Sequence, residues 1–310
     1  MRQSISLEKY VGFSKSVYKK KREKFNAFDS LNYLFLAILS LICFFPIVYE
    51  LLLSIASKED YLNSNILVIP RHLNFDNYIY IFGQGKVGPA LLVSLLTTVA
   101  GTIYAMILTS FGAYAFTRKR VPGIKVIFAL IIFTMFFGGG IIPFYLTVKG
   151  VIGLNNLWCL IVPFGLNSFN LIILKNFFSQ VPYEVIESAR LEGASEFTIL
   201  FRIVVPLSKP GLSTILLWYV ISFWDAWYWP SFFLSSAEEL YPLALVLRNL
   251  IQSYDGSNPI KDDVIIDGGN LYSLGTNAAT IMISVIPILI FYPFLHKYFT
   301  KGQLAGSIKG

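Results

Sequence analysis

The chain has 310 residues, of which 55% are hydrophobic and only 14% are charged, and its mean hydropathy is +0.63. In a soluble domain about a quarter of the residues are charged, so this composition excludes an ordinary soluble protein and indicates a membrane protein. The net charge of +7 could suggest a nucleic-acid partner, but the placement of the basic residues is better explained by membrane topology, so no nucleic acid is expected.

Six apolar segments follow one another along the chain. A helix needs about 20 apolar residues to cross a hydrocarbon core of about 30 Å. The segments of this length lie at about 31–57, 90–117, 126–148, 157–177, 211–234 and 275–296. The first one is too long for a cleavable signal peptide, so it is expected to stay in the lipid bilayer. The sequence therefore predicts an all-α membrane protein with six transmembrane helices within residues 31–297.

The basic residues orient these spans. Cytoplasmic loops of membrane proteins are enriched in Lys and Arg. Nineteen of the 25 Lys and Arg residues lie in the N-terminal tail, the 118–125 loop, the 175–209 region and the C-terminal tail. We therefore expect the tails 1–30 and 298–310 in the cytoplasm. The long segments 58–89 and 235–274 are then external, and the second carries Asp262, Asp263 and Asp267.

Several kinds of chemistry find no support in the sequence. Cys43 and Cys159 lie in apolar runs and only two histidines occur, so neither a disulfide framework nor a metal site is expected. The chain lacks a Gly-x-x-x-x-Gly-Lys-Ser/Thr phosphate-binding loop and any pattern of acid, base and nucleophile. We therefore predict no catalytic residue, no metal site and no cofactor bound by this chain, and a membrane enzyme is disfavoured.

A charged helical motif lies between the fourth and fifth spans, in the predicted cytoplasmic loop 179–209. Pro182 suits the first position of a helix, and Glu184 and Glu187 in its first turns favour interaction with the helix dipole. Gly193 can adopt the left-handed conformation that ends a helix. Helices that lie on a membrane surface are usually basic, whereas this one is acidic at its start. Docking into a protein groove is therefore the better interpretation.

A second short helix is expected directly after this turn. Ser195 can cap its N-terminus, and the helix should run from Glu196 to about Val204. Pro206 and Pro210 are expected to close it before the fifth span. The loop is thus predicted to be a helix–turn–helix at the cytoplasmic surface.

This loop resembles a known motif. It reads Glu187-Ser188-Ala189, three residues, Gly193, nine residues, and then Ile203-Val-Val-Pro206. The pattern resembles the EAA loop of bacterial ABC importer permeases, with Ser and Val replacing an Ala and a Leu. The resemblance implies a coupling helix that sits in a cleft of a separate ATP-binding subunit. Its residues here would be Glu184, Glu187, Ser188, Ala189, Leu191, Gly193, Ile203 and Pro206, with Glu187 contacting the ATPase, Ala189 packing in the cleft and Gly193 providing the turn.

Other stretches narrow the resemblance. "HKYFTKGQLAGSIKG" at the C-terminus and "LSKPGLSTILL" after Pro206 are similar to the sugar branch, the maltose-transporter-like permeases of the smaller type. The run from Gly138 to Phe178 resembles a subgroup associated with complex oligosaccharides and polysaccharide fragments. The resemblance implies a type I ABC importer permease fold in a bacterial cytoplasmic membrane, working by ATP-driven alternating access. Implied partners are a second homologous permease, two ATP-binding subunits that hold the ATP and magnesium, and an external solute-binding protein.

Candidate sugar-contacting residues lie in the fifth span. Aromatic faces and polar groups bind sugars, and this span reads "WYVISFWDAWYWP", with Trp224, Asp225, Trp227 and Tyr228 as candidates. Trp224 and Asp225 lie deeper and favour the substrate pathway, since an intramembrane ionisable residue is a functional hypothesis. Trp227 and Tyr228 lie near the external end and suit an interfacial aromatic belt equally well. An aspartate here argues mildly against an acidic sugar beside it.

The fourth span adds Asn167 and Asn170, three residues apart on one helix face. Hydrogen bonds between helices and a role in the pathway explain them equally well.

The alternative to an importer permease is a self-sufficient secondary transporter, or a permease for another small polar solute. Such a protein predicts inverted repeats and more intramembrane charges than Glu50 and Asp225, the acidic residues in the central parts of the spans.

Overall fold

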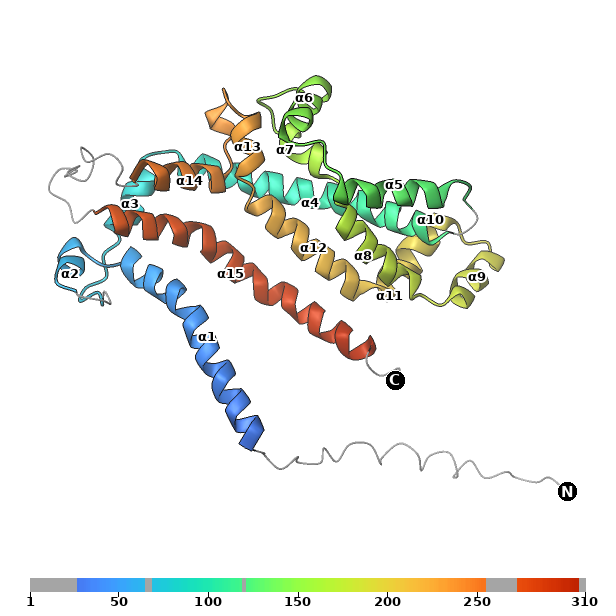
Figure 1. Ribbon diagram of the computed structural model, residues 1–310, viewed down its shortest axis with the longest axis horizontal. Coiled ribbons are helices and arrows are strands. Elements are labelled where there is room, and N and C mark those ends of the chain that lie inside the picture. Colours follow the sequence, from blue (N-terminus) through green and yellow to red (C-terminus); the bar gives the residue numbers. More distant parts are fainter. Residues whose placement is uncertain (1–26, 65–68, 119–120, 255–271, 307–310) are drawn as a thin grey trace. The chain divides into compact units, whose positions relative to one another are not determined.

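The computed structural model describes residues 27–64, 69–118, 121–254 and 272–306 (Figure 1). Within these ranges the regular secondary structure is entirely helical. The chain divides into two units, residues 1–49 and 50–310. The basic N-terminal tail and the predicted acidic stretch with Asp262, Asp263 and Asp267 lie outside the described residues.

The helices follow in chain order. The first unit contains most of α1 (Ala27–Ser54). The second continues through α2 (Lys58–Leu62), α3 (Asp76–Gly83), α4 (Val87–Thr117), α5 (Ile124–Phe136), α6 (Ile141–Val151), α7 (Trp158–Ile161), η3 (Val162–Phe164) and α8 (Ser168–Ser179). It ends with α9 (Tyr183–Leu191), α10 (Glu196–Ile199), η4 (Leu200–Val204), α11 (Val205–Leu207), α12 (Lys209–Trp224), α13 (Tyr228–Phe233), η5 (Glu238–Leu240), α14 (Leu243–Tyr254) and α15 (Ser273–Gly306).

Two helices among the described residues, Phe28–Ser54 and Val87–Thr117, are each long and apolar enough to cross a membrane. Two bent pairs also qualify if each is taken as one broken span. Trp158–Phe164 meets Ser168–Ser179 at 49°, and Glu196–Leu207 meets Lys209–Trp224 at 88°. Length and composition thus support two to four crossing segments in this part of the chain, and the count of six remains a prediction.

The third predicted span is not one helix. One span was predicted over 126–148, whereas α5 ends at Phe136 and α6 begins at Ile141. Gly138, Gly139 and Gly140 lie in the interruption, and Gly140 has a φ of 86°. Glycine is the poorest helix former after proline, so three in a row break the helix where apolarity alone suggests continuity.

The fourth and fifth predicted spans are interrupted as well. In the fourth, the chain leaves the helix after Phe164 and re-enters it at Ser168. In the fifth, α12 ends at Trp224 and α13 begins at Tyr228. Hydropathy reports the apolar length of a segment but carries no information about such breaks.

Helix α4 forms the centre of the second unit, and its most extensive contacts are with α12 and α8. Small side chains on α4 permit this close approach, and Ala105, Thr109 and Ala113 are fully buried. At Gly101 a Cβ atom would lie 2.6 Å from the Phe223 ring, so only glycine leaves room for this ring of α12. The largest buried cluster joins α4, α8 and α12 to the loop that contains α9, α10 and η4.

Candidate functional site

The first helix of the predicted coupling loop is α9. Its N-cap is Pro182, so the helix begins one residue later than expected. At its other end Gly193 has a φ of 82°, which confirms the predicted left-handed turn. The Gly193 and Ala194 amides donate to the carbonyls of Arg190 and Ala189 at 2.9 and 3.0 Å. These two bonds form a Schellman motif, which fixes the direction in which the chain leaves α9.

The second helix of the loop starts as predicted, because the Ser195 hydroxyl accepts a hydrogen bond from the Thr198 amide at 3.2 Å. It does not end at about Val204, before Pro206, as expected. Helical structure continues through the π-helix η4 and through α11 to Leu207. A π turn widens the helix locally, and the prolyl residue that follows it has no N–H to bond. The loop and α12 therefore meet at a bend around Ser208 rather than at the proline.

The two faces of α9 differ sharply. Ile186 is buried, and Ala189 packs on the same internal cluster, so this face fixes α9 to its own chain. The opposite face is open, with Leu191 86% exposed and Glu184 and Glu187 exposed. Of the other predicted coupling residues, Ser188, Gly193 and Pro206 are exposed and Ile203 is half-buried. The resemblance places Ala189 in a partner's cleft, whereas in this structure its contacts are internal.

An ionic cluster that the sequence did not predict joins the loop to α4. The Glu196 carboxylate accepts hydrogen bonds from Nε and Nη2 of Arg190, at 2.9 and 2.6 Å, and from the Tyr114 hydroxyl. The Nε atom of Arg118 lies 3.6 Å from Glu196, and its guanidinium carbon lies 4.1 Å from the centroid of the Tyr114 ring. We call Tyr114, Arg118, Arg190 and Glu196 the Glu196 cluster.

The cluster changes the acidity of its carboxyl group. Partial burial by itself raises the pKa of Glu196, but the hydrogen bonds and the two positive charges outweigh burial and hold the pKa below its usual value of 4.5. A carboxyl group with a lowered pKa in the folded state stabilises the fold above its unfolded pKa, and this contribution is lost as the pH falls through the folded pKa.

We therefore expect the chain to melt at a higher temperature than the Glu196→Gln variant above pH 4.5, and this difference to shrink at lower pH. The measurement is the melting temperature of the purified chain and of the purified Glu196→Gln variant, in the same detergent, at pH values above and below that value. A difference that stays constant down to the lowest pH would show that the charge of Glu196 does not stabilise the fold.

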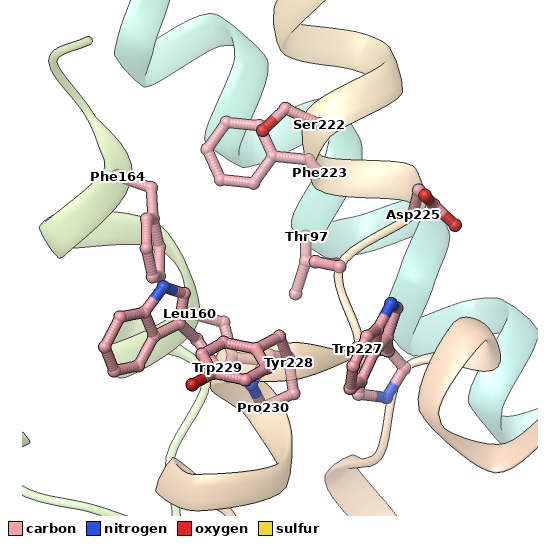
Figure 2. Close-up of a pocket in the computed structure, with 12 residues that line it drawn as sticks. Thr97, Leu160, Phe164, Ser222, Phe223, Asp225, Trp227, Tyr228, Trp229 and Pro230 are labelled. Carbon is pink, nitrogen blue, oxygen red and sulfur yellow. The ribbon is translucent and has the colours of Figure 1, made fainter. Parts of the chain in front are cut away.

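A cavity of about 300 Å³ lies where α12 gives way to α13. Asp225, Trp227 and Tyr228, three of the predicted pathway residues, line it. Thr97 of α4 and Phe164 of η3, which the sequence did not single out, complete the wall from other elements (Figure 2). We call this space the aromatic cavity. Its volume is at the lower end of the range for small-molecule sites.

The other predicted pathway residues do not line the aromatic cavity. Trp224 packs toward α14 and α15, and its indole N–H donates to the Ser284 carbonyl at 3.2 Å. Asn167 caps α8, because its side-chain oxygen accepts from the Asn170 amide at 3.1 Å. Asn170 is buried within the helix packing. The structure thus separates Trp224, Asn167 and Asn170 from the residues that surround the cavity.

Charge near the cavity is unevenly placed. The Asp225 side chain lies on the Trp227 side of the cavity and extends away from Phe164 and Trp229 (Figure 2). Arg248 of α14 lies over the ring of Trp227, with its guanidinium carbon 3.8 Å from the ring centroid. This stacking places a positive charge beside a cavity-lining aromatic ring.

Comparison with known proteins identifies the family to which this chain belongs. Residues 121–304 match the family described as binding-protein-dependent transport system inner membrane component. The chain belongs to this family, so it is a membrane component of a transport system that works with a binding protein. A self-sufficient secondary transporter is a different class of protein, and family membership excludes it.

Individual relatives are similar over almost their full length. The chain is 36% identical to the polygalacturonan/rhamnogalacturonan transport system permease protein of Bacillus subtilis (strain 168), over 91% of this chain and 98% of the relative. It is 27% identical to the arabinooligosaccharides transport system permease protein of the same organism, over 89% and 94%. A crystal structure of a bacterial ABC transporter involved in the import of the acidic polysaccharide alginate contains a chain with 29% identity and a TM-score of 0.80, covering 91% of this chain and 99% of that one. The fold is therefore that of an ABC importer permease.

Proposed function

We propose that the chain is a transmembrane permease subunit of an ABC importer that carries oligosaccharides or polysaccharide fragments across a bacterial cytoplasmic membrane. Its relatives in Bacillus subtilis, which span nearly the whole chain, are permeases for saccharides. The observation that carries the proposal within the molecule is α9, which is anchored on one face and presents Glu184, Glu187 and Leu191 on the other. In this proposal the chain crosses the membrane six times, with both termini in the cytoplasm.

The open face of α9 is the proposed contact with one of two ATP-binding subunits. Those subunits would bind ATP and magnesium and hydrolyse the ATP, while this chain binds no cofactor. A second homologous permease would complete the translocation path, and a solute-binding protein would deliver the sugar from outside. The acidic residues Glu184 and Glu187 favour a basic rim around the partner's cleft, and Leu191 suits an apolar pocket within it.

The proposed cycle is alternating access. Docking of the loaded binding protein and ATP-driven closure of the ATPase pair would displace α9 and open the path outward. Hydrolysis would reset the path and release the sugar inward. The chain's own contribution is to transmit displacement from the loop and to offer aromatic surfaces along the path.

For the substrate we propose a fragment of an acidic polysaccharide. Two of the similar proteins are described by acidic polymers, galacturonan and alginate. In this chain Arg248 places a positive charge beside Trp227, and the Asp225 side chain extends away from Phe164 and Trp229. The sequence-based argument against an acidic sugar assumed that Asp225 faces it. Asp225 lines the same cavity, so the proposal places the acidic sugar beside Trp227 and Arg248 rather than beside Asp225.

The test is uptake of labelled galacturonan fragments and of neutral arabinan fragments by proteoliposomes that contain the complete importer. We expect ATP-dependent uptake of the acidic fragments and a loss of about three- to tenfold in their uptake by Trp227→Ala, because a stacked aromatic contact contributes about 0.5–1.5 kcal/mol. The matched control is Trp158→Ala, since Trp158 is exposed on α7 and does not line the cavity. Preference for the neutral fragments would refute the substrate class, and uptake without ATP would refute the importer.

A further inference from the structure

We propose that the Glu196 cluster is the mechanical link through which the coupling loop moves α4, and that Glu196 is its positioning residue. The inference rests on the proposed function. It identifies the helix that the loop displaces as α4, which precedes the loop by more than sixty residues, rather than α12, which follows the loop directly.

One carboxylate connects three helices. Glu196 is the first residue of α10, Arg190 lies in the last turn of α9, and Tyr114 lies in the last turn of α4. Because Arg190 donates two hydrogen bonds to Oε1 and Tyr114 donates to Oε2, both oxygens of Glu196 are held by different helices. Two hydrogen bonds from Arg190 to Oε1 and one from Tyr114 to Oε2 together restrict the orientation of the carboxylate as well as its distance from both helices. A displacement of α9 must therefore displace the end of α4.

The side chains of Glu196 and Arg190 are 51% and 29% exposed, and an exposed ion pair alone contributes little, so the strength of the cluster depends on Arg118. The side chain of Arg118 is only 14% exposed, and its Nε and Nη2 atoms make no hydrogen bond within the described part of the chain. The positive charge of Arg118 is stabilised instead by the carboxylate of Glu196 and by the face of the Tyr114 ring. Removing the charge of Glu196 would leave the mostly buried guanidinium of Arg118 without this carboxylate partner, which weakens the cluster. The link is thus resistant to being pulled apart.

The direct route along the chain is a poor transmitter. Between α10 and α12 the chain passes through the π-helix η4 and then bends by 88° near Ser208. A bend with a widened turn can absorb motion by changing its angle. The loop also packs on α4, α8 and α12 through Ile186, Ile199 and Leu200, but these apolar contacts lack the directional hydrogen bonds of the Glu196 cluster.

Helix α4 is well suited to carry the motion to the cavity. It is one helix of 31 residues, and its only proline, Pro89, lies in the first turn. Tyr114 in the cluster and Thr97 in the wall of the aromatic cavity lie on this same helix, 17 residues apart, which corresponds to about 25 Å. Phe223, a further cavity residue, packs directly on Gly101 of α4. A shift of α4 along its axis would therefore change the cavity wall.

The experiment uses the complete importer in proteoliposomes, with Glu196→Gln in this chain. We expect the ATPase subunits to co-purify in the wild-type ratio and ATP hydrolysis to continue, while the sugar transported per ATP falls at least about fivefold. A second readout follows α4 itself. In a Cys43→Ser background, with Cys159 left in its buried position, Thr97→Cys should react with a thiol reagent at a rate that depends on ATP. The Glu196→Gln substitution should abolish that dependence.

Two further variants make the outcome decisive. Glu192→Gln removes the same charge from an exposed position of the same loop and should keep the wild-type transport per ATP. Tyr114→Phe removes one hydrogen bond of the cluster but keeps the ring beside Arg118, and should give an intermediate loss in an intact complex.

Wild-type coupling in both Glu196→Gln and Tyr114→Phe overturns the proposal. An equal loss in Glu192→Gln overturns it too, as does a failure of Glu196→Gln to assemble combined with normal coupling in Tyr114→Phe. An unmodified complex that moves no sugar with ATP would instead contradict the proposed function.

Discussion

Replacing Gly193 by proline is expected to abolish uptake while the chain still inserts into the membrane. Gly193 has a φ of 82°, and the proline ring fixes φ near −65°, so the turn after α9 cannot form. Proline also removes the amide that donates to the Arg190 carbonyl in the Schellman motif. The direction of the chain after α9 then changes, and Glu196 is carried away from Arg190 and Tyr114. The Glu196 cluster is then lost, and with it the link between α9 and α4.

Three substitutions of Gly193 distinguish the effect of the backbone conformation from that of the space available to a side chain. A Cβ atom on Gly193 would meet no atom within 4 Å, so alanine fits and suffers only the strain of a left-handed conformation, about 1–2 kcal/mol. Asparagine tolerates that conformation better. Uptake by cells with equal amounts of each variant in the membrane should fall in the order Gly, Asn, Ala, Pro. Normal uptake with proline would contradict the coupling role of this loop, and equal defects with all three would show that the backbone angle does not decide the effect.

Replacing Gly211 by alanine is expected to destabilise the fold more than a typical change of one methyl group. Gly211 lies in the first turn of α12, where a Cβ atom would lie 2.3 Å from Cγ and 2.8 Å from Cβ of Phe177 on α8. These atoms form the base of the phenylalanine side chain, so turning the ring does not move them away. The two helices must separate. We expect a loss of about 1–3 kcal/mol, seen as a lower melting temperature of the purified chain.

The rescue of this variant tests the explanation. Phe177→Ala removes the ring and Cγ, so the double variant should be more stable than the sum of the two single effects predicts. Gly150→Ala is the matched control, because Gly150 lies in α6 with no atom within 4 Å of the added Cβ. It should be neutral or slightly stabilising. Additive single effects in the double variant would show that the contact with Phe177 is not the cause.

Features set by neighbouring residues could be predicted from the sequence. The left-handed turn at Gly193 and the cap at Ser195 depend on a few adjacent residues, and both occur as expected. The continuation of helix past Pro206 was missed, because the π turn that precedes it has no distinctive residue pattern. The interruption at Gly138–Gly140 was visible as a glycine run, but the apolar residues on both sides concealed its effect.

Features that join distant parts of the chain could not be predicted. Nothing in the sequence links Glu196 to Tyr114, 82 positions earlier, so the sequence does not distinguish Glu196 from the other acidic residues of the loop. The aromatic cavity was found in part, since Trp227 and Tyr228 are adjacent, whereas Thr97 and Phe164 come from other helices. Trp224 shows that a prediction of cavity-lining residues can fail by a single position in the sequence. It is the last residue of α12 and contacts α15, whereas Asp225, the next residue, lines the cavity.

The glycine run between α5 and α6 restricts which molecules can lie against its backbone. With 13 and 11 residues, the two helices reach about 20 Å and 17 Å, so neither spans a hydrocarbon core of about 30 Å alone. Gly138–Gly140 are exposed in the isolated chain and lie outside any helix. Acyl chains cannot solvate the peptide groups of irregular backbone. Since the third predicted span places this stretch within the membrane, we expect it to be wetted by water or covered by another polypeptide rather than by annular lipid.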